Sequence, residues 1–355
     1  MNYICTWFCA DEEGEESIFP QTGQKSSSKQ HQDIYWRCIV LFYATSKRFN
    51  KNERHLLFTN VKLLPFLDDR NVVDMLADLQ VEVVYTDFKY KTPKGYFEMF
   101  QNQFYEFSIL EYISKNNNNP ADTYMILDSD CIFLKPAAAL FEAGDQNNGF
   151  LSFEDDCTTD LIIHGLSRKD MKVLYQSLLR KPIDTIPGYH LGEFFLANVK
   201  NIQIIFSEFL IVWAKMLVRF SLNLPKFNEE AQTLSYIYYK NGFKASPSRS
   251  LMKRIWTNPV FYRNVDESDM DLVVWHLPSE KTYGLTDLYR MIINMLPDYG
   301  LNLTSHEYIN ITSKTLGIPY LSPLMKIKYY SSSYYRAIRK RARKAPFISK
   351  LLESV

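Results

Sequence analysis

The stretch that decides the fold is residues 124–136, which read YMILDSDCIFLKP. Residues 124–127 have the length and apolar composition of a short buried strand. Asp128 and Asp130 follow it, so two carboxylates would emerge at the carboxyl end of a strand, where open α/β sheets bind ligands. Two oxygen ligands suit a hard divalent cation such as Mg²⁺ or Mn²⁺, which keeps waters and is completed by substrate phosphates. The stretch therefore predicts a metal site at a sheet edge.

A simpler interpretation of this motif is a turn, because Asp and Ser are common turn residues. Apolar residues flank the motif on both sides, at 124–127 and 132–134. They would place the carboxylates deep in the fold, where an unpaired charge is costly. We therefore favour a bound cation over a turn.

The composition is that of a folded globular protein. Hydrophobic residues make up 46% and aromatic residues 15% of the 355 residues, and there are only 12 glycines. This composition excludes disorder over most of the chain. A chain of this length forms one large core or two modest ones.

Cysteine usage and the N-terminus bear on the cellular compartment. The five cysteines are odd in number and lack paired zinc spacing, so neither a disulfide framework nor a structural zinc site is predicted. No secretory signal is readable, because the first ten residues are followed at once by three acids. The longest apolar region, residues 202–218, contains Glu208 and Lys215 and is not expected to span a membrane. We expect a cytoplasmic protein.

Apolar runs alternate with helical periodicities along the chain. Strands are predicted at residues 3–9, 56–59, 81–85, 124–127, 149–153, 194–197 and 272–275. Helices are predicted at residues 33–49, 69–79, 96–114, 202–220 and 229–240. Within the first helix, residues 39–43 fit a buried strand equally well. The alternation predicts an α/β fold with a mostly parallel central sheet flanked by helices, and ligand chemistry at its carboxyl edge.

Five segments, in this order, resemble the Asp-x-Asp glycosyltransferases of the GT-A fold, in particular bacterial enzymes that build cell-surface polysaccharide. The segments are residues 55–60, 124–136, 192–195, 228–230 and 275–278. The resemblance implies a Rossmann-like GT-A catalytic domain, which we place at residues 1–300. Within it, we expect residues 11–30, which are acidic and then rich in Gly, Ser and Gln, to form a mobile loop.

The resemblance also implies roles for single residues. Asp130 would ligate the metal on the donor diphosphate, and Asp128 would contact the ribose or the metal. His276, at the end of the strand predicted at residues 272–275, would complete the metal shell. Lys281 would steady the diphosphate, although the family's Gly-rich form of this loop is not matched.

Five further residues complete the predicted site. Thr6, near the end of the first strand, and Asp87, after the third, stand where GT-A enzymes hold the nucleotide base and ribose. Glu193, Glu229 and Glu230 are candidates for a carboxylate that takes the acceptor's hydroxyl proton or holds sugar hydroxyls. For the last two, a contact with the positive end of a helix, worth under about 1 kcal/mol, is an equally good explanation.

The C-terminal extension, residues 301–355, is basic and aromatic. Between Glu307 and Glu353 there are ten basic residues and no acid. A basic amphipathic helix with aromatic residues suits an anionic membrane surface, to which each base contributes roughly 1 kcal/mol. Nucleic acid would attract the same charge, but no recognisable nucleic-acid module accompanies it. We expect a protein that binds the inner face of a membrane peripherally and does not bind nucleic acid.

Together these features predict a metal-dependent glycosyltransferase that uses Mn²⁺ or Mg²⁺. It would move a sugar from a nucleotide diphosphate donor, a UDP-sugar in our interpretation, to a glycan or lipid-linked acceptor. One alternative is a sugar-nucleotide nucleotidyltransferase, which would carry a Gly-rich phosphate loop after the first strand, whereas residues 11–30 have only isolated glycines. Another alternative is a non-catalytic membrane-associated scaffold.

Overall fold

The computed structural model describes residues 1–12, 14–16, 25–97, 99–246, 250–327 and 329–331. The strands are β1 (Asn2–Phe8), β2 (Arg54–Thr59), β3 (Phe66–Leu67), β4 (Arg70–Asn71), β5 (Val81–Tyr85), β6 (Thr123–Leu127), β7 (Cys131–Phe133), β8 (Phe150–Leu151), β9 (Phe194–Asn198), β10 (Met252–Arg254) and β11 (Val274–His276). The α-helices are α1 (Lys29–Phe49), α2 (Val72–Asp78), α3 (Tyr105–Asn116), α4 (Ala138–Gln146), α5 (Arg168–Leu179), α6 (Val199–Ser221), α7 (Glu230–Asn241), α8 (Gly284–Tyr289) and α9 (Ser305–Leu316).

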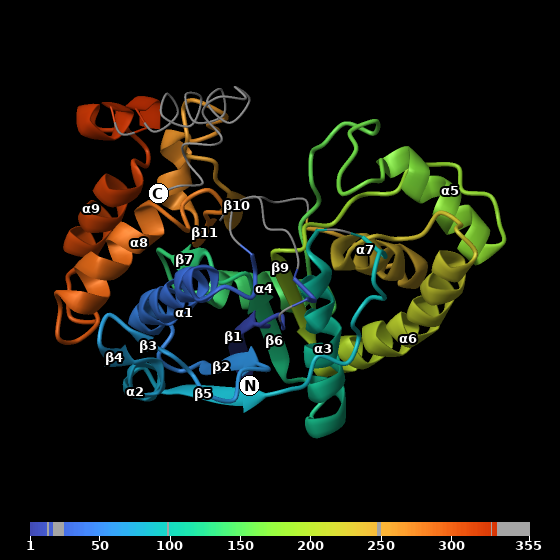
Figure 1. Cartoon of the computed structure of the whole chain (residues 1–355), viewed down its shortest axis with the longest axis horizontal. Coiled ribbons are helices and arrows are strands. Elements are labelled where there is room, and N and C mark those ends of the chain that lie inside the picture. Colours follow the sequence, from blue (N-terminus) through green and yellow to red (C-terminus); the bar gives the residue numbers. More distant parts are fainter. Residues whose placement is uncertain (13, 17–24, 98, 247–249, 328, 332–355) are drawn as a thin grey trace, which may run out of the picture.

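A six-stranded sheet with the order β5-β2-β1-β6-β9-β8 runs through the centre of the molecule (Figure 1). β5, β2, β1 and β6 are mutually parallel. β9 is antiparallel to β6, and β8 is antiparallel to β9. The predicted α/β class with a mostly parallel central sheet is therefore confirmed.

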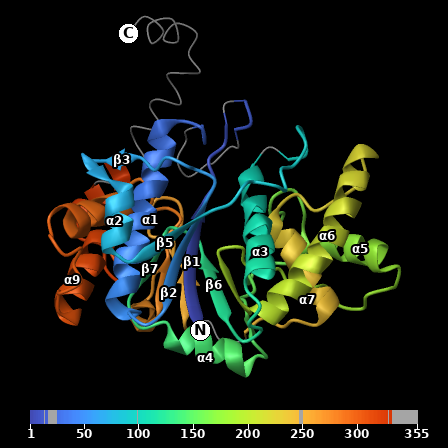
Figure 2. The ribbon, with the colours of Figure 1, turned by 90° about the horizontal axis from the view of Figure 1, so that it is seen from below.

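Successive side chains of each central strand enter two different cores, as the period of two along a strand requires. In β1, Ile4 and Phe8 pack into one core and Tyr3 and Cys5 into the other. Helices α1, α2, α8 and α9 contribute to the first core, and α3, α5, α6 and α7 to the second. Figure 2 shows the two groups of helices on opposite sides of the sheet. The molecule is thus a three-layer sandwich of helices, sheet and helices.

A smaller sheet with the order β10-β11-β7 lies beside the central one. β10 and β11 are parallel, and β11 is antiparallel to β7. The sequence predicts residues 272–275 as the last strand of the core. This placement is wrong, because β11 belongs to the second sheet. Since β7 follows β6 after three residues, the chain crosses from one sheet to the other within the Asp-x-Asp motif.

The helix predicted at residues 96–114 is also wrong at its N-terminal end. α3 begins at Tyr105, after a single 3₁₀ turn, Gln101–Phe104. Phe100 has φ 55°, which a right-handed helix does not permit, and the Tyr96 hydroxyl donates to the Phe227 carbonyl at 2.7 Å. Tertiary packing of these aromatic rings overrides the helical spacing that they show in the sequence.

The segment for which the sequence allowed either a helix or a strand forms a helix. α1 begins after Ser28, whose hydroxyl accepts from the His31 amide, and it contains residues 39–43, for which a strand was the alternative. The mobile loop predicted at residues 11–30 falls in part on residues 13 and 17–24, which lie outside the described residues.

α6 is long and apolar enough to cross a membrane by length and composition alone. Its inner face, with Ile205, Phe209 and Val212, is packed in the second core. Its outer face exposes Leu210 and Ile211.

The predicted extension begins with a packed helix. Tyr308 of α9 is 2% exposed, and its hydroxyl donates to the Phe133 carbonyl on β7 at 2.6 Å. Arg48 of α1 donates to the carbonyls of Gly300 and Leu301 just before this helix. The division of the chain at residue 300 stays a prediction, and residues 328 and 332–355 of the extension lie outside the described residues.

Replacing Tyr308 tests whether α9 contributes to the stability of the whole fold. Tyr308→Phe removes one buried hydrogen bond, so we expect the free energy of unfolding to fall by about 1 kcal/mol. Tyr308→Ala also leaves a cavity and should cost about 3–5 kcal/mol. Chemical denaturation measures both changes. Tyr85→Phe, at an exposed position on β5, is the matched control and should change stability by less than about 0.5 kcal/mol. Equal stability of all three variants would show that α9 is not part of the cooperative unit.

Candidate active site

Backbone hydrogen bonds fix the Asp-x-Asp motif between the two sheets. The amide of Asp128 donates to the Glu193 carbonyl at 3.1 Å, directly beyond the pairing of β6 with β9. The amide of Leu277 donates to the Asp130 carbonyl at 3.0 Å, directly beyond the pairing of β7 with β11. Each acid is thus attached to a different sheet, and its backbone has little freedom to move.

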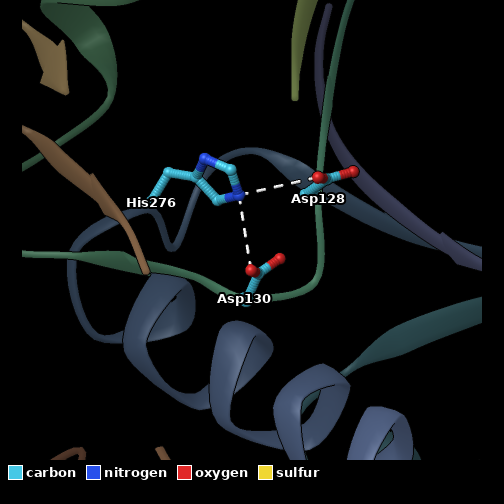
Figure 3. Close-up of side chains that lie close together, drawn as sticks. All are labelled: Asp128, Asp130 and His276. Atoms are coloured by element: carbon cyan, nitrogen blue, oxygen red, sulfur yellow. Dashed lines mark ion pairs between the residues drawn. The ribbon is translucent and has the colours of Figure 1, made fainter. Parts of the chain in front are cut away.

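The same pairing brings in His276. This residue ends β11 and lies opposite Cys131, the first residue of β7. Its Nε2 atom is 3.3 Å from Asp130 Oδ2 and 3.6 Å from Asp128 Oδ2 (Figure 3). One potential ligand atom from each residue lies within 4.8 Å of the others. The structure thus brings together the three predicted metal residues.

Two cationic side chains accompany this acidic pair. The Lys281 ammonium donates to Asp130 Oδ2 and is itself buried. Burial alone would raise the pKa of Asp130, but the charges of Lys281 and His276 hold it well below its usual range. His276 has its pKa raised to about 9, because Asp130 and Glu193 outweigh the effect of burial. For Asp128, burial and then the charge of Asp130 raise the pKa to about 6.

These residues fit a divalent cation. Asp130 Oδ1 and both ring nitrogens of His276 are buried and make no hydrogen bond within the described part of the chain. Two carboxylate oxygens and one imidazole nitrogen form a ligand set that Mn²⁺ accepts, and Mg²⁺ accepts the oxygens. Lys281 occupies the other oxygen of Asp130 and leaves Oδ1 available. Since a metal-bound imidazole must be neutral, binding would release the proton that His276 otherwise holds.

Asp128, Asp130 and His276 line a cavity of about 220 Å³ at the carboxyl end of β1 and β6. One wall carries His31 and Tyr35 from α1 together with Lys281. Another wall carries Phe100 and His164. The Tyr35 ring lies 5.5 Å from Lys281 Nζ and 4.7 Å from the ring of His31, so these three side chains form a single group.

All three predicted catalytic acids line this cavity, but their carboxyl groups differ in their hydrogen-bond partners. Glu193 is bound by Arg254, whose Nε donates to Oε1 at 2.9 Å. Both oxygens of Glu229 accept hydrogen bonds, one from the Tyr189 hydroxyl and one from His164 Nδ1. Oε2 of Glu230 is buried without a hydrogen-bond partner among the described residues.

The two residues predicted to hold the nucleotide lie elsewhere. Thr6 is completely buried, and its hydroxyl donates to the Leu127 carbonyl at 2.7 Å. Asp87 is exposed, two residues beyond β5. Neither lines the cavity, whereas Trp7 and Cys9, at the end of β1, do. The proposed contacts of Thr6 and Asp87 with the base and the ribose therefore stay predictions.

Sequence reasoning missed several residues of the site. Arg254 ends the short strand β10 and is separated by 61 residues from its partner Glu193, so no local pattern identifies it. His164 stands in a His-Gly pair, which signals a turn but not a site. Glu106 of α3 does not line the cavity, but it lies close enough to Asp128 for their charges to interact. It is one residue before Phe107, where helical spacing predicts only packing.

No protein-family model and no curated protein matches the chain. Similar solved structures include the galactosyltransferase LgtC in complex with donor and acceptor sugar analogues, at 9% identity and a TM-score of 0.47, over 92% of this chain and 99% of that one. Mouse xyloside xylosyltransferase 1 is 12% identical at a TM-score of 0.44, over 78% of this chain and 98% of that one. The bifunctional glycosyltransferase WbbM is 10% identical at 0.46, over 77% of this chain and 45% of that one. These structures are glycosyltransferases.

Glu106 gives a test of the electrostatics of the site. It is 3% exposed, and burial, followed by the charge of Asp128, raises its pKa from 4.5 to about 8. A carboxyl group with a raised pKa costs stability as the pH rises from its unfolded pKa through its folded pKa. In buffer with a metal chelator, we expect Glu106→Gln to raise the free energy of unfolding by about 2–4 kcal/mol at pH 8 and by little at pH 5.

Chemical denaturation at both pH values measures this difference. Glu142→Gln, at an exposed position on α4, is the control and should have little effect at either pH. The same gain for Glu106→Gln at pH 5 and pH 8 would show that Glu106 does not titrate in this interval.

Proposed function

We propose that the protein is a metal-dependent glycosyltransferase of GT-A architecture, which transfers a sugar from a nucleotide diphosphate donor, a UDP-sugar, to a glycan or lipid-linked acceptor. The observation that supports this function best is the cluster of Asp128, Asp130 and His276 in a cavity at the carboxyl edge of the parallel sheet. This is the edge at which open α/β sheets bind ligands.

Asp128, Asp130 and His276 would hold Mn²⁺ or Mg²⁺. When bound, such a cation neutralises the negative charge that develops on the leaving diphosphate. The protein adds Lys281, an ammonium that is buried beside Asp130 and available to a phosphate oxygen at the same place. We therefore assign the wall formed by Lys281, Tyr35 and His31 to the donor diphosphate.

Other residues that line the cavity have the groups that a sugar requires. Glu230 and Arg254 supply a carboxyl group and a guanidinium, which bind hydroxyls by hydrogen bonds. A second cavity of about 890 Å³ adjoins the first and shares Glu193, Arg254 and Trp256 with it. With Tyr262 also in its wall, this space is suited to further sugar units of a glycan acceptor, because aromatic rings pack against sugar faces.

The metal site can be tested with a change that preserves side-chain shape. Asp130→Asn removes the charge shared by Lys281 and His276, so we expect metal-dependent binding of the donor to be lost and sugar transfer to fall by at least about 100-fold. A screen of nucleotide sugars for thermal stabilisation with and without Mn²⁺ measures binding, because a ligand that binds only the folded state raises the melting temperature. Transfer is then measured with the donor that the screen selects.

Asp271→Asn is the matched control, because the side chain of Asp271 is 89% exposed. If wild-type protein shows no metal-dependent stabilisation by any nucleotide sugar, the proposed function fails. A non-catalytic scaffold would also show no metal-dependent stabilisation by nucleotide sugars. A nucleotidyltransferase would instead form a sugar nucleotide from a sugar phosphate and a nucleoside triphosphate.

The basic extension provides a separate test of membrane attachment. Tyr329 donates to Glu280 at 2.8 Å and is buried, so the truncation should start after Ser331. We expect deletion of residues 332–355 to preserve metal-dependent donor binding and to release the protein from vesicles that contain anionic lipid. Binding of the full chain should weaken as salt rises, because exposed charges are screened beyond about 8 Å at physiological ionic strength.

Co-sedimentation with anionic and with neutral vesicles measures this attachment. Equal binding to both kinds of vesicle, or equal binding of the truncated and full-length chains, would contradict a role of the basic residues.

A further inference from the structure

A tight turn presents His164 at the wall of the first cavity. Ile163 and Leu166 exchange backbone hydrogen bonds of 2.9 and 3.2 Å, and the two residues between them have φ 46° for His164 and 83° for Gly165. Two positive φ angles in succession are typical of a type I′ turn, which favours Asn or Gly at both central positions. Non-glycine residues seldom adopt a positive φ, and His is one of the types that do so most often.

The beginning of α7 holds this turn at three points. Asn228 Nδ2 donates to the His164 carbonyl at 2.9 Å, and Gln232 Nε2 donates to the Ile163 carbonyl at 3.0 Å. The Glu229 carboxylate accepts from His164 Nδ1 and from the Tyr189 hydroxyl. Both the backbone and the imidazole ring of this residue are therefore fixed.

A second residue in an unfavourable backbone conformation packs against the same ring. Phe100 has φ 55°, and its ring centroid lies 4.8 Å from that of His164. A bulky side chain rarely occupies the left-handed region, and such strain persists only where the surrounding structure imposes it. Phe100 and His164 are far apart in the sequence and both have a positive φ. Their rings pack against each other in the cavity wall.

The hydrogen bond to Glu229 determines what this imidazole offers to a ligand. With Nδ1 donating to the carboxylate, the neutral ring carries a lone pair on Nε2. Nε2 makes no hydrogen bond with the described residues, and the side chain is 31% exposed. The arrangement provides a proton acceptor whose orientation is set by a buried carboxylate, which is the logic of an oriented base.

The three acids predicted as catalytic groups are less suited to accept a proton. Glu193 is bound by Arg254, and both oxygens of Glu229 already accept hydrogen bonds. Glu230 is buried next to Glu229, and its pKa is raised well above the usual range by burial and by that neighbour. A carboxyl group that keeps its proton cannot accept another.

We propose that His164 binds the reacting hydroxyl of the acceptor and accepts its proton, with Glu229 as its positioning residue. The proposal rests on the glycosyltransferase function. In this step the hydroxyl oxygen forms a bond to the anomeric carbon of the donor sugar. The bond from that carbon to the diphosphate oxygen breaks, its electron pair leaves with the diphosphate, and the hydroxyl proton passes to His164 Nε2 and then to solvent.

Two variants of His164 separate proton transfer from structure. His164→Gly suits the positive φ of the turn and leaves space for imidazole from the buffer. His164→Asn also tolerates this backbone conformation and still forms hydrogen bonds, but it does not accept a proton at neutral pH. We expect each to lower kcat for transfer by about 10²–10⁴-fold, with the metal-dependent binding of the donor unchanged. Added imidazole should restore transfer by the glycine variant in a concentration-dependent manner.

The control is His306→Asn, at an exposed position on α9, which should keep full transfer with or without imidazole. Near wild-type transfer by either His164 variant overturns the proposal, as does a failure of imidazole to restore any transfer by the glycine variant. These outcomes require wild-type protein that transfers sugar. Absence of transfer and of metal-dependent donor binding in the wild type would instead refute the glycosyltransferase function itself.

Discussion

The ion pairs of Asp130 are the interaction on which the rest of the site depends. Its carboxylate is 1% exposed and lies against the ammonium of Lys281 and the imidazole of His276. A buried charge of this kind is tolerated only when it is paired, and removal of one partner typically costs about 3–5 kcal/mol. His276 ends β11 and Lys281 follows it five residues later, so the second sheet has to dock on the first for the acid between them to be stable.

This requirement explains why the chain changes sheets within the Asp-x-Asp motif. If β6 and β7 continued in one sheet, Asp128 and Asp130 would extend along a single strand direction, away from β11. The change lets Asp128 keep its contact with the Glu193 backbone while Asp130 takes one with Leu277. A chain of charges then continues outward, since His276 Nδ1 lies 3.4 Å from Glu193, and Glu193 is bound by Arg254. The same groups that stabilise the junction of the two sheets therefore form the floor of the cavity.

The sequence predicts those parts of this arrangement that depend on local pattern. Apolar runs identified the central strands, and the position of Asp128 and Asp130 directly after one of them predicted that both acids lie at the carboxyl edge of the sheet. The role of His276 was implied by the family resemblance, and pairing of β11 with β7 brings it to the two acids. The prediction was wrong where aromatic residues with helical spacing pack in tertiary structure, as at Phe100. It could not find Arg254 or His164, because their partners are 61 and 65 residues away and short polar segments carry no periodicity that would pair them.

The start of α7 shows how two adjacent acids acquire different properties. Glu229 is the N-cap of α7 and has an extended backbone, whereas Glu230 is the first helical residue, so their side chains leave the chain in different directions. Glu229 accepts hydrogen bonds from two side chains, Tyr189 and His164. Glu230 faces Gly192, where even a Cβ atom would lie 2.5 Å from its Oε1, and its Oε2 is buried without a hydrogen-bond partner among the described residues. Burial, together with the charge of Glu229, raises the pKa of Glu230 well above its usual range and favours its neutral form. At the start of one helix the protein thus places one acid that orients an imidazole and one carboxylic acid that can donate a hydrogen bond to a sugar.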